Sequence, residues 1–350
     1  MFHLTKEGIP YGTIILGSRA TWLDRHAAEE LRSYVKKLSG ATLIITHECY
    51  ASSIEGGKIL IGRASTSDIV GAFAAHYPDV LPEESDTEND CVAYAVRGDT
   101  LVISGSNDRS VYYSVCHLLQ TEFGVGFYWD RDVFEKKRSL SLPDGLTLQE
   151  RSEFKMRHTI GQWVYNYGAF LNEAERREEL DKSARNKINS YRLYSWNSYA
   201  RKKTFIELGL TGIEITAEDI ARRDMVRDSI EYAQSLGMEV MVPLIPDETT
   251  LEFRALYPNA RYFGCEWVKD DNAAPQTIPC LYPEDPMYKT FIQTFVKVWI
   301  EAYGPTSNFV CCPPAEHHIS TGVEDFININ INYSKYTYEA LHELIPSARL

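Results

Sequence analysis

The chain has 350 residues, a formal net charge of -13, and a hydrophobic fraction of 44%. This length accommodates two domains or one large one, and the hydrophobic fraction is that of an ordinary globular protein. The acidic balance, without a long basic run, argues against nucleic acid as a partner.

The N-terminus and the apolar segments predict a cytoplasmic protein without a membrane partner. Residues 1–7 (MFHLTKE) contain no apolar segment of the signal-peptide type, and no window approaches the ~18 apolar residues of a membrane span. The seven cysteines are scattered and odd in number, so we interpret them as reduced thiols. A disulfide between Cys265 and Cys280 is the open alternative.

The first 150 residues are predicted to form an α/β domain, a small sheet with two helices on it. Patterns of β-branched or alternating residues predict strands at residues 11–16, 43–46, 58–61, 91–96 and 100–104. A helix is expected over 22–38, with Thr21 as its cap, and a second from Ser106 or Asn107 to about residue 123. The acidic, proline-containing residues 79–90 are predicted to form a solvated loop. No G-x-G-x-x-G motif follows a strand and opens a helix, so no nucleotide cofactor is expected.

After a boundary near residue 150, strands and helices alternate. Strands are expected at residues 155–163, 188–194, 238–244 and 308–312, and helices at 172–187, 222–236, 286–303 and 333–344. Alternation with short connections implies parallel strands, as in a (β/α)8 TIM barrel. About four β/α units fit where a closed barrel needs eight, so we predict a barrel that is truncated. The predicted domains are 1–150 and 151–350, and an open doubly wound sheet is the alternative.

Residues 308–318 (NFVCCPPAEHH) predict a buried strand that stops and presents a carboxylate. Phe309 to Cys312 are apolar, and Pro313-Pro314 cannot extend a central strand. Glu316 therefore follows the end of a strand, where such barrels carry catalytic groups; a surface-loop glutamate is the alternative. Successive side chains of an extended segment point apart, so residues 316–318 are not expected to share a metal ion.

Several motifs resemble those of the family 89 glycoside hydrolases, the α-N-acetylglucosaminidases. In the family's order and at roughly its spacing, the chain carries FIELGLTGIEI, AQSLGMEVMVPLIP, YPNARYFGCEW, PEDPMYKTFIQTFVKVWIEAYG and CCPPAEHH. The resemblance runs from about Arg157 to Leu350. Residues 20–40 (ATWLDRHAAEELRSYVKKLSG) and 104–130 (SGSNDRSVYYSVCHLLQTEFGVGFYWD) resemble the domain that precedes the barrel in this family and in the α-glucuronidases.

This resemblance implies a retaining, exo-acting glycosidase in which Glu316 is the general acid/base. The family's nucleophile carboxylate lies on a later strand, so here it is expected beyond residue 350, and this chain alone would carry half of the catalytic pair. Ala315 stands where the family has an asparagine that would contact substrate or orient the acid. This departure leaves the substrate open.

Aromatic, amide and acidic residues at or near the predicted strand ends are the expected contacts to a carbohydrate. They are Trp163, Asn166, Tyr194, Trp196, Asn197, Glu266, Trp267 and His317. Core packing is the alternative for the aromatic residues. Alternative functions are an α-glucuronidase-like enzyme, in which Arg157, Arg192 or Arg261 would meet a uronate, a catalytically incomplete carbohydrate-binding protein, and a fragment that self-associates through a sheet edge.

Overall fold

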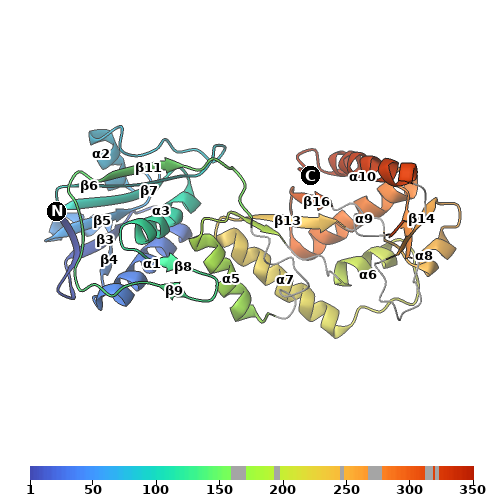
Figure 1. Cartoon of the computed structure of the whole chain (residues 1–350), viewed down its shortest axis with the longest axis horizontal. Coiled ribbons are helices and arrows are strands. Elements are labelled where there is room, and N and C mark those ends of the chain that lie inside the picture. Colours follow the sequence, from blue (N-terminus) through green and yellow to red (C-terminus); the bar gives the residue numbers. More distant parts are fainter. Residues whose placement is uncertain (159–170, 193–197, 245–247, 267–277, 312–317, 320–322) are drawn as a thin grey trace. The chain divides into compact units, whose positions relative to one another are not determined.

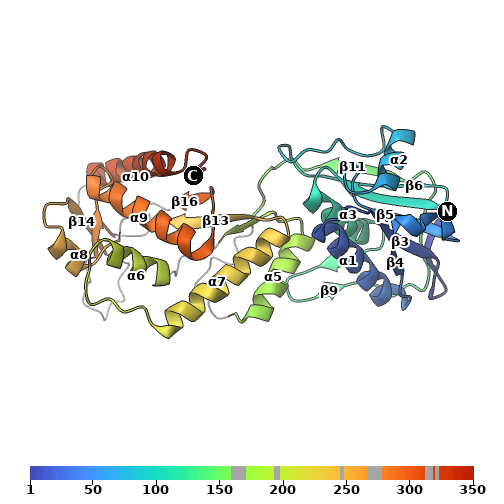
Figure 2. The same cartoon turned by 180° about the vertical axis from the view of Figure 1, so that it is seen from behind.

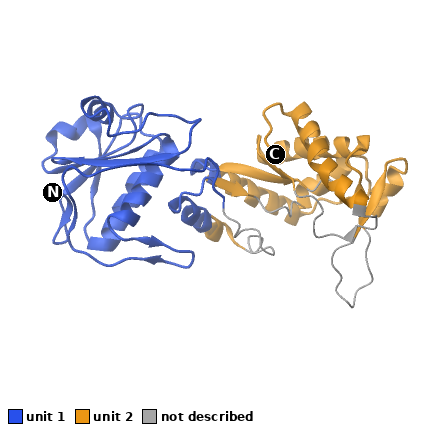
Figure 3. Cartoon of the chain, turned by 45° about the horizontal axis from the view of Figure 1, so that its top comes forward, with its two compact units in different colours: residues 1–158, 177–189, 233–238 blue, residues 159–176, 190–232, 239–350 orange. Residues whose placement is uncertain are grey.

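The structure is a mixed α/β fold with several sheets (Figures 1 and 2). This computed structural model describes residues 1–158, 171–192, 198–244, 248–266, 278–311, 318–319 and 323–350. The chain forms two compact units (Figure 3). The first comprises Met1–His158, Arg177–Asn189 and Ala233–Met238, and the second comprises Thr159–Arg176, Ser190–Tyr232 and Glu239–Leu350.

The first unit is built on a six-stranded sheet in the order β11-β6-β7-β5-β3-β4. The strands are β3 (Gly12–Leu16), β4 (Ile44–His47), β5 (Gly57–Ile61), β6 (Cys91–Arg97), β7 (Thr100–Gly105) and β11 (Thr147–Arg151). Strands β4, β3, β5 and β7 are parallel, whereas β6 and β11 are antiparallel to their neighbours. The neighbours Ile14 and Ile15 point to opposite faces and both are buried, so the sheet needs cover on both sides.

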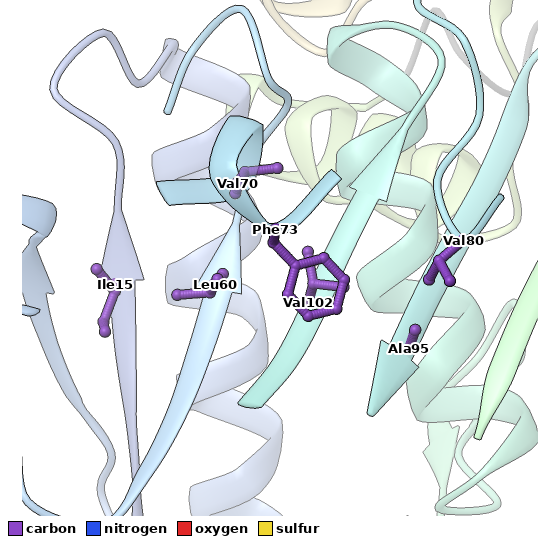
Figure 4. Packing of buried hydrophobic residues seen from close by; sticks show 7 residues of the cluster. All are labelled: Ile15, Leu60, Val70, Phe73, Val80, Ala95 and Val102. Atoms are coloured by element: carbon purple, nitrogen blue, oxygen red, sulfur yellow. The ribbon is translucent and has the colours of Figure 1, made fainter. Parts of the chain in front are cut away.

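Helices supply this cover. Helix α1 (Trp22–Ser39) packs with α3 (Asp108–Thr121) on one face. Helix α2 (Asp68–His76) covers the other, where Val70 and Phe73 meet apolar side chains of four strands (Figure 4). The N-cap of α1 is Thr21, as the sequence predicts, and that of α3 is Asn107, one of the two residues that the sequence offered.

The five strands and two helices predicted for this unit are confirmed. Helix α2 was not predicted, because it is short and carries a glycine, Gly71, among its apolar residues. Short strands were also missed: β1 (Phe2–Lys6), β2 (Ile9–Pro10), β8 (Gly126–Phe127), β9 (Asp132–Val133), β10 (Leu140–Leu142) and the edge strand β11. They lack a local signal, since each depends on a partner distant in sequence, or is too short to show a period.

A buried carboxylate, Asp90, joins four segments of the first unit. It accepts hydrogen bonds from Asn107 Nδ2 (2.8 Å), Arg109 Nε (2.9 Å) and Asn189 Nδ2 (3.2 Å), and it forms an ion pair with Arg157. Burial raises the pKa of this carboxyl, but the two arginines and Asn107 outweigh burial and hold the pKa below its ordinary value. The prediction that residues 79–90 are all solvated is therefore wrong at Asp90, where buried donors compensate its charge.

The second unit contains three parallel strands in the order β12-β13-β16, as their alternation with helices predicts. They are β12 (Ser190–Arg192), β13 (Glu239–Leu244) and β16 (Phe309–Cys311). After these strands the chain returns once more. Arg349 forms a parallel bridge to Asn308, and its carbonyl accepts from the Phe309 N–H at 2.9 Å. The parallel strands do not close into a barrel within the residues described.

In the described residues after 170, the helices are α5 (Glu173–Arg185), α6 (Ser198–Glu207), α7 (Ala217–Ser235), α8 (Leu251–Leu256), α9 (Pro286–Tyr303) and α10 (Val323–Leu344). Most of α5 and the last residues of α7 belong to the first unit. The predictions for α5, α7 and α9 are confirmed, while α6 and α8 were missed. Helix α10 begins ten residues before the predicted residue 333. Residues 327–332 alternate Ile and Asn, a strand-like period that concealed the helix.

A second, antiparallel sheet was not predicted. It has the order β15-β14-β17, formed by β14 (Tyr262–Glu266), β15 (Ile278–Leu281) and β17 (His318–Ile319). Cys265 and Cys280 lie in its buried cluster as thiols, so the disulfide left open by the sequence does not form.

Candidate active site

The carboxyl ends of β12, β13 and β16 lie at one edge of the parallel sheet. Arg192 is level with Met241, and Cys311 is level with Leu244 at the end of β13. From these ends the chain continues into residues 193–197, 245–247 and 312–317. Three segments therefore start from the edge at which α/β folds place their ligand-binding groups.

The end of β16 is held by buried polar contacts. The Cys311 thiol donates to the Thr337 hydroxyl of α10 at 3.7 Å, and this hydroxyl shares a 2.6 Å hydrogen bond with the Tyr288 hydroxyl of α9. Thr337 and Tyr288 are both fully buried. The starting point of residues 312–317 is thereby fixed against two helices.

The opposite end of β16 is fixed by charge. Glu239, the first residue of β13, accepts from Asn308 Nδ2 at 3.2 Å and from the Arg349 guanidinium at 3.0 Å. These contacts join β13, β16 and the returning chain at the amino edge. They set the register in which the carboxyl ends of the strands align.

The antiparallel sheet is tied to the two connections that follow β13 and β16. His318 in β17 is the register partner of Glu266 in β14. After β13, Glu248 bridges to Cys280, and the Thr249 N–H donates to the Pro279 carbonyl at 2.9 Å. Residues 312–317 thus run from the parallel sheet to the antiparallel one.

The antiparallel sheet is anchored by a cluster of apolar residues and by a helix cap. Phe263, Cys265 and Cys280 pack with Ile329 of α10. Asp285, the N-cap of α9, accepts from the backbone N–H groups of Met287 and Arg261, each at 2.8 Å. The acidic residues of the PEDP motif therefore include a structural cap.

The structure describes few of the site residues predicted from the sequence. Outside the described residues lie Glu316, His317, Trp163, Asn166, Tyr194, Trp196, Asn197 and Trp267. Glu266 is described by its backbone, which pairs with His318, two residues after Glu316. The sequence did not predict this pairing, because a two-residue strand has no period of its own.

Two of the arginines considered for a uronate have structural partners. Arg157 pairs with Asp90 and donates from Nε to the Lys187 carbonyl at 2.7 Å. The Arg261 guanidinium lies 4.7 Å from the centre of the Tyr282 ring. Arg157 is therefore occupied in the first unit, and we no longer expect it to bind substrate.

Among the described residues, no three His, Cys, Asp or Glu side chains gather closely enough to hold a metal ion. No helix in the described parts of the chain has the length and apolar character needed to cross a membrane.

The fold is similar to those of several solved glycoside hydrolases. A family 89 glycoside hydrolase from Clostridium perfringens, in complex with 2-acetamido-1,2-dideoxynojirmycin, matches with a TM-score of 0.66 and 14% identity, over 93% of this chain and 36% of that protein. A GH20 β-N-acetylhexosaminidase from Streptomyces coelicolor A3(2) matches with a TM-score of 0.54 and 15% identity, over 100% of this chain and 65% of that protein. A GH138 enzyme that targets pectin rhamnogalacturonan II matches with a TM-score of 0.54 and 13% identity, over 97% of this chain and 43% of that protein.

At these identities the likeness defines the class of fold, that of glycoside hydrolase domains, and not an activity. The chain spans 36% of the length of the family 89 protein. No protein-family profile matches the sequence, and no curated protein sequence matches it significantly.

Proposed function

We propose that the chain carries the acid/base half of a retaining, exo-acting glycoside hydrolase of the α-N-acetylglucosaminidase type. Glu316 is its general acid/base. The observation that carries the proposal is the common carboxyl edge of β12, β13 and β16, from which the segment holding Glu316 departs after Cys311. Similarity to glycoside hydrolases over 93% of the chain supports the same class.

The order of the parallel strands supports a (β/α)8 barrel for residues 151–350, preceded by an α/β domain over residues 1–150. Strands β12, β13 and β16 and then Arg349 follow one another in space as they do in sequence. An open doubly wound sheet reverses its strand order at a switch point, whereas a barrel continues in one direction.

The substrate contacts follow from the same edge. Tyr194, Trp196 and Asn197 follow the end of β12, and Glu266 pairs beside the segment of His317. Together with Trp163, Asn166 and Trp267 they would supply aromatic faces and hydrogen-bonding groups to a sugar ring. The ligand named for the family 89 relative, an acetamido-sugar analogue, favours an amino sugar over a uronate.

The chemistry requires two carboxyl groups. Glu316, protonated, would give its proton to the leaving oxygen while a second carboxylate attacks the anomeric carbon, and would then deprotonate the water that releases the sugar. We place this second carboxylate outside residues 1–350, following the family's order of strands. Glu316 must then have a pKa raised by apolar surroundings or by the neighbouring carboxylate.

Hydrolysis of 4-nitrophenyl α-N-acetylglucosaminide by the full-length gene product tests the role of Glu316. We expect Glu316→Ala to lower turnover by about 10²–10⁴-fold. Azide should restore turnover and yield the α-glycosyl azide, because it replaces the water that needs a general base. Glu324→Ala is the matched control, since Glu324 is an exposed glutamate in the first turn of α10. Equal rates for Glu316→Ala and the parent would remove Glu316 from the mechanism. Hydrolysis of 4-nitrophenyl α-D-glucuronide, tested in parallel, but not of the N-acetylglucosaminide would support the glucuronidase alternative.

A further inference from the structure

The first unit contains a pocket of about 330 Å³ at the N-terminal ends of α1 and α3. It is lined by the first residues of both helices, by Asp86 and by residues of the 234–237 segment. Its volume is at the lower end of the range of small-molecule sites, about 300–1,000 Å³. The proposed hydrolysis does not use it.

The wall formed by residue 237 is tightly built. The Arg109 guanidinium donates from Nη1 to the Gly237 carbonyl at 3.1 Å, while its Nε donates to Asp90. Gly237 has a φ of 75°, and a Cβ added there would lie 2.8 Å from Arg109 Cβ and 3.4 Å from Leu23 Cδ1. This wall is therefore formed before any ligand arrives, which lowers the entropic cost of binding.

Trp22 presents an oriented aromatic surface to this pocket. Its ring stacks on His26 with centroids 4.7 Å apart and 13° between planes, and His26 stacks in turn on the buried Tyr112 at 4.9 Å. The Trp22 side chain nevertheless remains 47% exposed and lines the pocket. Burial lowers the pKa of His26, which keeps the imidazole in the stack neutral near pH 7. An indole held in this way offers a flat apolar surface without losing side-chain freedom on binding.

The remaining side chains at the pocket rim are polar and carry mainly negative charge. Asp86 and Gln234 are exposed, and Asp108 is half-buried and paired with Arg63. Carboxylate and amide groups accept and donate hydrogen bonds as hydroxyl groups require. Arg109, the cation of the lining, is already paired with Asp90. This charge balance disfavours a uronate, a phosphate or any other anion.

From these observations we propose that the pocket binds a neutral pyranose ring of a carbohydrate. The apolar face of the ring stacks on Trp22, and its hydroxyl groups meet Asp86, Asp108 and Gln234. The first unit thereby gains a sugar-binding function of its own, and this proposal does not depend on hydrolysis by Glu316.

Fluorine NMR of the chain labelled with 5-fluorotryptophan tests the site directly. The chain has six tryptophans, and the Trp22 resonance is the one absent from the Trp22→Phe spectrum. The probes are methyl α-D-N-acetylglucosaminide, methyl α-D-galactoside and D-glucuronate. We expect at least one neutral glycoside to shift the Trp22 resonance in a saturable way, and glucuronate to leave it unchanged. The Trp129 resonance is the internal control, because Trp129 is 52% exposed in the same unit but does not line the pocket.

Substitutions at the rim then test the contacts without touching the tryptophan. Asp86→Ala and Gln234→Ala should each weaken the interaction, and together by about tenfold. Asp79→Ala, an exposed aspartate outside the lining, should have no effect. The proposal is overturned if no neutral probe moves the Trp22 resonance, or if the double variant binds as the parent does. Glu316→Gln should leave this binding intact, so failure of the hydrolase proposal would be recognised separately.

Discussion

Both units contain parallel strands whose carboxyl ends meet at one edge, yet the two edges are used differently. In the first unit, β3, β5 and β7 lead into α1, α2 and α3, and one of the chain's own carboxylates, Glu48, occupies the edge at the start of α2. Glu48 accepts from the Ser18 N–H (2.6 Å), the Ser67 hydroxyl (2.9 Å) and the Ile69 N–H (3.3 Å). An anionic ligand would need these same donors at the start of α2.

In the second unit, the corresponding edge leads into the segments that hold the proposed catalytic and sugar-binding residues. The comparison teaches that the fold places a possible ligand site at the carboxyl edge of a parallel sheet, and that the side chains at this edge decide whether a ligand can bind there. At the start of α2 in the first unit, Glu48 already accepts from the donors that a ligand would need. The second edge leads into residues 312–317, the segment that contains the proposed acid/base Glu316.

The largest effect is expected for the ion-pair cluster that binds residues 152–157 and 186–189 to the first sheet. Asp90→Ala would leave two largely buried arginines, Arg109 and Arg157, without their carboxylate. We expect a loss of about 3–5 kcal/mol in the free energy of unfolding, measured by urea denaturation. Asp99→Ala, at an exposed turn, is the control. A loss below about 1 kcal/mol would mean that the first unit does not depend on this cluster.

Substituting two glycines, one from each unit, distinguishes the cost of backbone strain from the cost of steric overlap. Gly237 and Gly212 have φ values of 75° and 80°, but only Gly237 has neighbours within 4 Å of an added Cβ. Alanine at either position should destabilise by about 1–2 kcal/mol because of the left-handed backbone. Gly237→Ala should lose about 1–3 kcal/mol more through overlap with Arg109. If thermal denaturation shows the same loss of stability for Gly237→Ala and Gly212→Ala, the residues around Gly237 can move to accept the added methyl group.

The smallest effect is expected for Glu48, the carboxylate that accepts hydrogen bonds at the start of α2. Burial raises its pKa, but the hydrogen bonds from Ser18, Ser67 and Ile69 prevail and lower it to about 2. Since the unfolded pKa is about 4.3, the stabilisation is complete above that pH and is lost as the pH falls towards 2. Glu48→Gln should therefore lower Tm at pH 7 and converge with the parent near pH 2. The difference should correspond to less than about 1 kcal/mol, because the carboxylate is only partly buried and solvent screens its interactions.

The matching control is Glu55→Gln, at an exposed residue of the same connection. Its Tm should follow the parent at every pH. A difference in Tm between Glu48→Gln and the parent that stays constant from pH 7 to pH 2 would show that the charge of Glu48 does not stabilise the first unit.

The sequence was sufficient for elements that carry their signals locally. Thr21 and Gly40 delimit α1, and the Gly98 turn joins β6 to β7, as their spacing predicts. The order of parallel strands in the second unit also followed from the alternation of elements. Each of these depends on residues within a few positions of one another, so the physical cause is present in a short window.

Tertiary structure decided the features that depend on distant partners. Asp90 lies in an acidic stretch and has no local sign of burial. Its burial becomes favourable through contacts with Arg109, Arg157 and Asn189. The two residues of β17 become a strand only beside β14, which brings Glu266 to His318. The exposed Trp22 becomes a candidate binding surface only because α3 and residues 234–237 complete the pocket. In each case the stabilising group lies far along the chain, and pairing between distant groups leaves no period or cap in the sequence around either one.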